Sequence, residues 1–310
     1  MTILPWTQII IFFYIIFKIF DIKENIVKVL IVFIVFSPQI LLLISRMNND
    51  LLIFILIFFI VLKNKNYLNT IVITYISLAK FYPLISSVIF FLNSEKLKKN
   101  FLYLFITLIL FISFIFFTID YNQIESFFEH RGQLYGKSLR NFSIIASAKY
   151  YSIIFSDIDF YKKFDFTLFL ILLFLIISAI SYFLLSKSKK YHFDITNLNF
   201  RLFVVGANII VITYIIFQNT FYREVYLILV IPFLLQYLKD STFNRYLFYF
   251  IFIKYFLGFL FVILFPIIGI IPIIVLFKMI LDFFIIAILS GLLIHINLII
   301  LREKLRLTKF

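Results

Sequence analysis

The sequence predicts an all-α membrane protein, a polytopic helical bundle with about nine to eleven membrane segments, several of them short. Hydrophobic residues make up 64% of its 310 residues, and the mean hydropathy is +1.11. Apolar runs follow one another from end to end, which excludes a soluble fold. Leu, Ile and Phe fill these runs without a sustained apolar–polar alternation, so helices are favoured over barrel strands. We therefore expect one integral-membrane domain, 1–310.

The predicted segments are separated by polar connectors. The apolar runs lie at approximately 7–20, 27–45, 51–62, 68–79, 83–92, 101–119, 166–186, 201–218, 224–238, 246–265 and 273–301. Six connectors are basic: 21–28, 63–67, 93–100, 187–192, 239–245 and 302–309. Basic connectors mark the cytoplasmic side of a membrane protein, so the net charge of +14 indicates orientation and no nucleic-acid partner. The chain has no cysteine, which excludes disulfides and thiolate ligands.

The membrane topology depends on Lys80-Phe81-Tyr82-Pro83, which interrupts a run that could otherwise be one span. If 68–92 crossed once, the basic connectors 63–67 and 93–100 would lie on opposite sides. If the interruption is a turn at the surface, all six basic connectors lie on the same side. Pro83 favours the turn, because proline restricts the preceding residue and removes a helix donor. The cost is three short segments of 10 to 12 residues, roughly 15–18 Å of helix against a core of about 30 Å.

This threading places four polar clusters on the outer membrane face, where short segments would leave a recess. The clusters are Arg46/Asn48/Asp50, Lys80/Tyr82, the long loop of about 120–165, and Asn219 to Arg223. The same threading puts Met1 outside, so we expect an odd number of further spans upstream. The clusters together predict one site at that face.

The first two clusters carry groups suited to a sugar phosphate. Arg46 can donate a forked pair of hydrogen bonds to phosphate, and Lys80 can add a second cation. Asp50 can accept a proton from a hydroxyl or bind a divalent cation, while Asn48 and Tyr82 can orient a sugar. Simpler interpretations are an Arg46–Asp50 ion pair, a lysine extending to the headgroups, and a tyrosine in the interfacial aromatic belt.

The segment from Asn219 to Arg223 supplies the last cluster. Arg223 is a basic residue on the face that should lack them, which favours an anionic ligand. The simpler interpretation is a structural pair between Arg223 and either Glu224 or Asp50. Within the later runs, we expect Asp282 to make a packing hydrogen bond and Lys254 to snorkel.

The order of these motifs resembles bacterial integral-membrane glycosyltransferases with the GT-C fold, in particular glycosyltransferase family 87 and uncharacterised relatives. The motif Arg46-x-Asn48-x-Asp50 is similar to their "RGN-x-D" segment, and Lys80-Phe81-Tyr82-Pro83 to their "K-x-YP" element. A loop "YG" is matched by Tyr135-Gly136. A late "N-x-x-YR" is matched by Asn219 and Tyr222-Arg223, before an apolar run that ends in proline. Met47 stands where the family has glycine.

The resemblance implies transfer of a sugar from a polyprenyl-phosphate donor to a glycan or glycolipid acceptor at the outer face of a bacterial cytoplasmic (inner) membrane. Asp50 is then the candidate catalytic residue, and the substrate-binding candidates are Arg46, Asn48, Lys80, Tyr82, Asn219, Tyr222 and Arg223. Members of the family usually carry their catalytic carboxylate in a first external loop, which would lie upstream of this chain. The alternatives are a transporter or flippase of lipid-linked glycans, whose pathway should be polar across the membrane, and an inactive truncated membrane protein. The inner halves of the runs are rich in Ile, Leu and Phe, which counts against the transporter.

Overall fold

The computed structural model describes most of the predicted membrane segments and one contact of the long loop. The described residues are 3–20, 24–45, 49–93, 97–118, 141–142, 166–187, 194–216, 219–238, 241–264 and 271–307. Arg46, Asn48, Tyr135-Gly136 and nearly all of the long loop lie outside these residues. Each of the eleven apolar runs is mainly helical over its described part, which confirms the predicted all-α fold class.

The helices before the long loop are α1 (Ile3–Ile19), α2 (Asn25–Val35), α3 (Pro38–Ser45), α4 (Asn49–Lys63), α5 (Asn66–Ala79), the 3₁₀ helix η1 (Tyr82–Leu92) and α6 (Leu97–Thr118). Those after it are α10 (Phe166–Lys187), α11 (Leu198–Ile216), the 3₁₀ helix η2 (Phe221–Tyr226), α12 (Leu227–Gln236), α13 (Thr242–Leu264) and α14 (Ile271–Leu307). Two-residue strands β1 (Asn141–Phe142) and β2 (Asn219–Thr220) pair antiparallel.

Five helices of the described residues are long and apolar enough to cross a membrane, namely α6, α10, α11, α13 and the middle of α14. The number becomes six if α2 and α3 together form one broken span, since their axes differ by 51°. Pro38 explains this break in the predicted run 27–45, because its ring removes a helix donor and restricts Ser37. The Ser37 hydroxyl donates to the carbonyl of Ile34 at 2.7 Å and closes the end of α2. A multi-pass membrane protein is thus what the helices support.

The interruption at Lys80 to Pro83 is the turn of a helical hairpin, as the basic connectors predicted. α5 and η1 pack against each other, and the Asn93 side-chain amide donates to the Asn66 side chain across the far end of the pair. Their lengths match, since 14 residues of α helix and 11 residues of 3₁₀ helix both span about 21–22 Å. The connectors 63–67 and 93–100 therefore lie at the same end of the hairpin.

The short segments are longer than the sequence indicated. α4 has 15 residues, or about 22 Å, where the apolar run alone predicted less. The difference arises because polar residues such as Asn66 and Asp50 lie inside the helices, and because η1 rises about 2.0 Å per residue. These helices remain shorter than a membrane core of about 30 Å.

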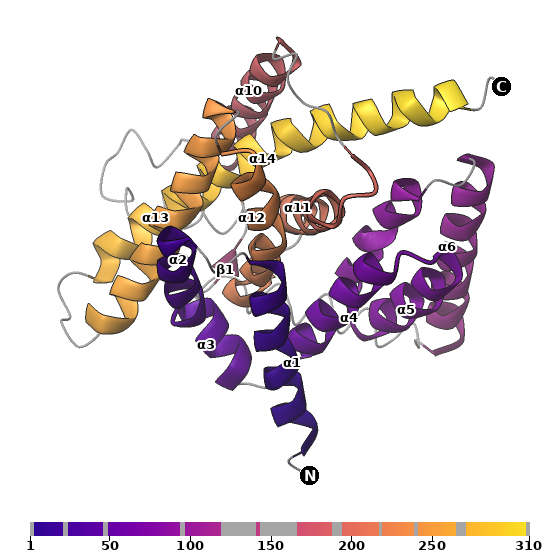
Figure 1. Ribbon diagram of the computed structural model, residues 1–310, viewed down its shortest axis with the longest axis horizontal. Coiled ribbons are helices and arrows are strands. Elements are labelled where there is room, and N and C mark those ends of the chain that lie inside the picture. Colours follow the sequence, from indigo (N-terminus) through magenta and orange to yellow (C-terminus); the bar gives the residue numbers. More distant parts are fainter. Residues whose placement is uncertain are drawn as a thin grey trace.

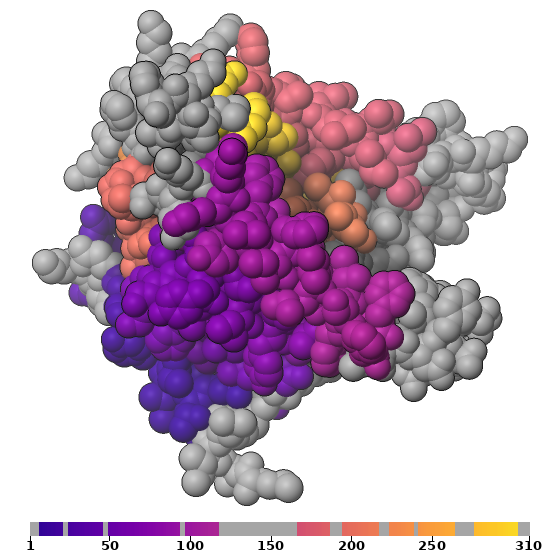
Figure 2. All heavy atoms as spheres, turned by 90° about the vertical axis from the view of Figure 1, so that its right-hand side faces the viewer, coloured from indigo at the N-terminus to yellow at the C-terminus, as the bar shows by residue number. Residues whose placement is uncertain are grey.

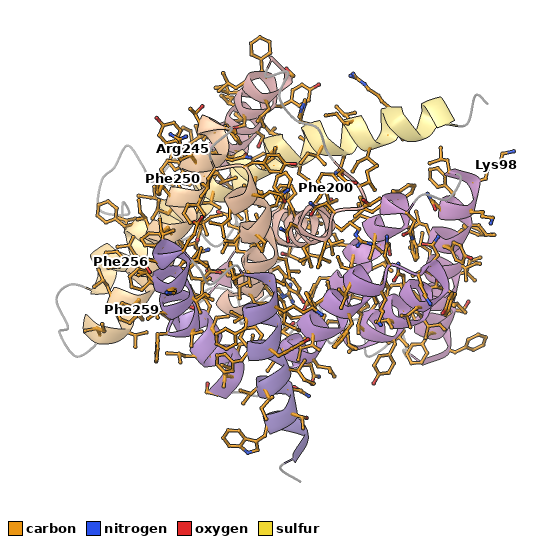
Figure 3. All side chains as sticks on the ribbon, in the orientation of Figure 1. Lys98, Phe200, Arg245, Phe250, Phe256 and Phe259 are labelled. Atoms are coloured by element: carbon orange, nitrogen blue, oxygen red, sulfur yellow. The ribbon has the colours of Figure 1, made fainter. Side chains whose placement is uncertain are left out.

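Figure 1 shows the arrangement of the helices around the centre of the molecule, with α4, α5 and α6 to one side and α2, α3 and α13 to the other. α11 and α12 pack on each other between these groups, and α11 also contacts η1. Lys98 and Arg245 are both labelled in the upper half of Figure 3, where α14 also ends, whereas the N-terminal end lies at the bottom. This agrees with basic connectors at a shared end.

The core lies where α11, η2 and α12 are enclosed by the other helices, and the outer helices carry exposed apolar side chains. Phe203 and Phe233 are fully buried, with ring centroids 4.4 Å apart. By contrast, Phe116 and Phe117 of α6 are more than four-fifths exposed, and α6 forms much of the surface that faces the viewer in Figure 2. Apolar side chains facing outward are expected of helices in lipid.

Candidate functional site

The described part of the predicted site centres on Asp50, in the first turn of α4. Its side chain is fully buried, and one oxygen lies 2.5 Å from the Lys80 ammonium. The other oxygen accepts a hydrogen bond from the Tyr82 hydroxyl at 2.5 Å. The start of α4 also favours this negative charge, because the first backbone N–H groups of a helix have no acceptor within it and give its N-terminus a partial positive charge. The turn of the hairpin thus places a cation and a phenol on one carboxylate.

η2 adds two more side chains to this cluster. The Tyr226 hydroxyl lies 3.0 Å from that of Tyr82, and the two rings meet edge to face at 5.9 Å. The guanidinium carbon of Arg223 lies 4.4 Å from the centre of the Tyr82 ring, within the range of a cation–π interaction. Asp50, Lys80, Tyr82, Arg223 and Tyr226 are hereafter the Asp50 cluster.

Part of the Arg223 guanidinium makes no hydrogen bond within the described residues. Its Nε and Nη1 are shielded from solvent and have no hydrogen-bond partner among the described residues. Neither does Arg223 form an ion pair with Glu224 or Asp50 within that part of the chain, so the simple pair expected from the sequence is not seen. A guanidinium held on an aromatic face with unused N–H groups suits a planar or tetrahedral anion.

Residues 141–142 of the predicted long loop lie at the same end of the molecule. They form β1, which pairs with β2 so that Asn141 lies opposite Thr220 and Phe142 opposite Asn219. β2 leads directly into η2. The structure therefore brings Asp50, the hairpin turn, residues 141–142 and the backbone of the segment 219–223 together. That the four polar clusters share the outer membrane face stays a prediction.

A second group of charges lies immediately beside the Asp50 cluster and was not predicted. Glu224 is fully buried and lies 2.7 Å from Lys254 and 2.8 Å from Lys278. Asp282 also contacts both lysines, with Lys278 at 3.0 Å one helical turn before it. Two cations and two anions thus form a closed ring, hereafter the four-charge ring.

Neighbouring groups complete the ring. The Gln39 side chain, next to the proline break, donates to Glu224 at 3.0 Å. The Tyr255 hydroxyl approaches the backbone carbonyl of Glu224 at 3.4 Å. Gly258 lets this break approach α13, since a Cβ there would lie 3.2 Å from the Pro38 ring. The ring therefore connects α3, η2, α13 and α14.

Several sequence predictions are corrected by these contacts. Lys254 does not snorkel, because it is fully buried and paired with two acids. Asp282 is an ion-pair partner rather than a simple packing contact. Tyr82 does not belong to an interfacial belt, since only 2% of it is exposed, and Lys80 extends to Asp50 rather than to headgroups.

Of the remaining candidates, the backbone of Asn219 lies in β2 and that of Tyr222 in η2, next to Arg223. Their side chains, and Arg46 and Asn48, fall outside what the structure describes. Sequence reasoning missed Tyr226 and Lys278. Tyr226 carries no polar signal within an apolar run, whereas a lysine inside the last span was a signal that could have been used.

The prediction that Asp50 binds a divalent cation stays a prediction. Among the described residues no group of three or more His, Asp or Glu side chains could hold a metal ion. Comparisons with models of known protein families, with curated proteins and with solved structures found no match to this chain.

Proposed function

We propose that this protein binds a polyprenyl-phosphate-linked sugar at one face of a bacterial cytoplasmic membrane and transfers the sugar to an envelope glycan or glycolipid. The observation that carries the proposal is the Asp50 cluster, in which groups from three separate segments meet at one end of short helices. The motif order that resembles GT-C glycosyltransferases is independent support. Both the cluster and the motif order suit a reaction at a membrane face in which the substrate is attached to a lipid.

Phosphate recognition is the part of the proposal with most geometric support. The Lys80 side chain is 24% exposed, and Arg223 has N–H groups without a partner among the described residues. Both could offset the charge that grows on a departing phosphate. The ring of Tyr82 packs against the guanidinium of Arg223, and Asp50 positions Lys80 by an ion pair and Tyr82 by a hydrogen bond.

In the proposed reaction, an acceptor hydroxyl attacks the anomeric carbon and the bond from that carbon to the phosphate oxygen breaks. The polyprenyl phosphate leaves with the bonding electrons, and the hydroxyl proton passes to a carboxylate. Asp50 is the candidate for that base, as the sequence predicted. Because its oxygens contact Lys80 and Tyr82, the acceptor would have to displace one of them to reach it.

The first experiment is a binding assay with the full chain in lipid nanodiscs. We expect a polyprenyl phosphate to bind and the uncharged polyprenol to bind much less. Replacing Arg223 with Gln removes a charged hydrogen-bond donor, so the affinity for the phosphate should fall at least about tenfold. Lys80→Gln should act in the same direction.

Arg245→Gln is the matched control, because it makes the same chemical change in α13, which follows the C-terminal end of α12, whereas Arg223 precedes the N-terminal end of α12. Equal binding of phosphate and polyprenol, or equal losses in the Arg223 and Arg245 variants, would contradict phosphate recognition. Sugar transfer that is unchanged in Asp50→Asn would remove Asp50 from the mechanism.

The alternative function, a transporter of lipid-linked glycans, gains one observation. The inner parts of α5 and η1 are not purely apolar, since Asn66, Asn69 and Asn93 are buried there. A vesicle assay for movement of a lipid-linked glycan across the bilayer separates the two functions. Movement without sugar transfer would favour the transporter.

A further inference from the structure

The hairpin of α5 and η1 carries a line of buried polar side chains along its whole length. On α5, Asn66, Asn69, Thr70 and Ser77 recur at spacings of three, four and seven residues, which puts them on one helical face, and Lys80 follows the end of the helix in an extended conformation. Asn69 and Ser77 are fully buried, and Asn66 and Thr70 nearly so. Such a face is unusual for a membrane helix, whose buried side is normally apolar or small.

η1 supplies polar groups where α5 has Ile73. Ser87 lies five residues after Tyr82, or about 10 Å along η1. Thr74 lies six residues before Lys80, or about 9 Å along α5, so Thr74 and Ser87 lie at a similar depth. Asn93 closes the line beside Asn66. Polar groups thus occur at each turn between the Asp50–Lys80 ion pair and the other end of the hairpin.

Several of these groups have no hydrogen-bond partner in the described part of the chain. Within the described residues, neither side-chain atom of Asn69 has a hydrogen-bond partner, nor do the hydroxyls of Thr74, Ser77 and Ser87. Buried polar atoms are bonded to protein or to ordered water in nearly all native structures. Amides and hydroxyls without a partner among the described residues can supply the two to four polar partners that each buried water needs.

We propose that α5 and η1 enclose a file of water molecules that connects the Asp50–Lys80 ion pair with the end of the hairpin at Asn66 and Asn93. The ligand is water, held by Asn69, Thr74, Ser77 and Ser87. The two helices pack directly on each other, and the Asn66–Asn93 hydrogen bond lies across the far end of the pair, so the proposed ligand is water and nothing as large as a glycan.

The file gives a fully buried carboxylate a route for exchanging protons with the membrane side that the connectors 63–67 and 93–100 face. At its other end, Lys80 and Tyr82 close the file by bonding to Asp50. The ammonium of Lys80 at that end also repels other cations. This proposal does not depend on the identity of the ligand at Arg223.

The absence of cysteine from the sequence makes the file testable with single thiols. Ser77→Cys is nearly isosteric, and the variant would be studied as the full chain in vesicles of each orientation. Silver ions would be added to one side, and the remaining thiol would be counted with a dye after unfolding. The matched control is Ile57→Cys, a fully buried apolar position on the neighbouring helix α4.

Silver ions bind the thiolate, and a dry apolar site disfavours that charged form. We therefore expect the thiol at position 77 to react at least about tenfold faster than the one at 57. The reaction should come from the side that the connectors 63–67 and 93–100 face. Adding Asn69→Leu, which has a similar volume and no polar atoms, should slow the reaction at 77 to the rate of the control.

Three results would overturn the proposal: equal rates at positions 77 and 57, reaction only from the opposite side, or a rate at 77 that Asn69→Leu leaves unchanged. Thermal unfolding and gel filtration of each variant establish that the protein is folded before the rates are compared. The phosphate-binding assay reads out at the other end of the hairpin, so failure of the water file leaves the proposed function standing.

Discussion

The four-charge ring makes a strong prediction about stability. Lys254 is fully buried and contacts Glu224 at 2.7 Å as well as Asp282. Replacing it with Met keeps the volume but leaves Lys278 as the single cation facing two buried anions. Removing one partner of a buried ion pair costs about 3–5 kcal/mol, because the other charge stays buried without compensation. We expect Lys254→Met to lose that amount.

Adding Asp282→Leu to Lys254→Met restores neutrality, since Lys278 and Glu224 remain paired at 2.8 Å. Buried ion pairs replaced by apolar residues are often neutral or stabilising, so the double variant should lie within about 1 kcal/mol of the wild type. The assay is unfolding by SDS titration from mild detergent. Lys98→Met, at an exposed position, is the control and should change stability by less than about 0.5 kcal/mol.

The reasoning is refuted if Lys254→Met loses less than about 1 kcal/mol, or if the double variant is no more stable than the single one. The first result would mean that the ring is hydrated, and the second that the loss comes from packing rather than from charge.

Three further predictions concern separate features. Gly291→Leu should destabilise the crossing of α10 and α14 by about 2–3 kcal/mol in the same titration, because even a Cβ there would lie 2.6 Å from that of Ser181; an unchanged stability would mean that the helices can move apart freely. Tyr82→Phe should cost about 1–3 kcal/mol by leaving an oxygen of Asp50 without its hydroxyl donor, and Tyr226→Phe should cost less because Tyr82 keeps that bond; the reverse order would contradict the cluster geometry. The side chain of Thr196 donates a hydrogen bond to the Asp194 carboxylate and lowers the pKa of that carboxyl. The stabilisation by Asp194 is therefore present above its unfolded pKa and is lost as the pH falls through the lower folded pKa. Thr196→Val should raise the pKa of Asp194, which carbon NMR of labelled aspartate would measure.

The sequence predicted the fold well because membrane helices are encoded locally. Each apolar run became a helix, and the charges of the connectors predicted the hairpin that Pro83 turns. The break at Pro38 and the 3₁₀ geometry of η1 were missed, since both depend on backbone hydrogen bonds that hydropathy does not report. A proline or a polar residue within a run was the available signal.

The site was predictable only in part, for a physical reason. The order and direction of the predicted spans are enough to place Lys80 and Asp50 on the same membrane face. The structure then shows that the two side chains are in contact. The four-charge ring joins residues from three distant segments, and one sequence contains no information on which buried charge faces which. Lys254 was therefore expected to reach the headgroups, although its partners lie inside the bundle.

η2 has only six residues, yet adjacent members belong to different clusters: Arg223 lies on the Tyr82 ring and Glu224 lies in the four-charge ring. The two residues share one stretch of backbone, so a shift of η2 moves the attachment points of both side chains together. We therefore expect a ligand that displaces η2 to change the contacts of both clusters at once.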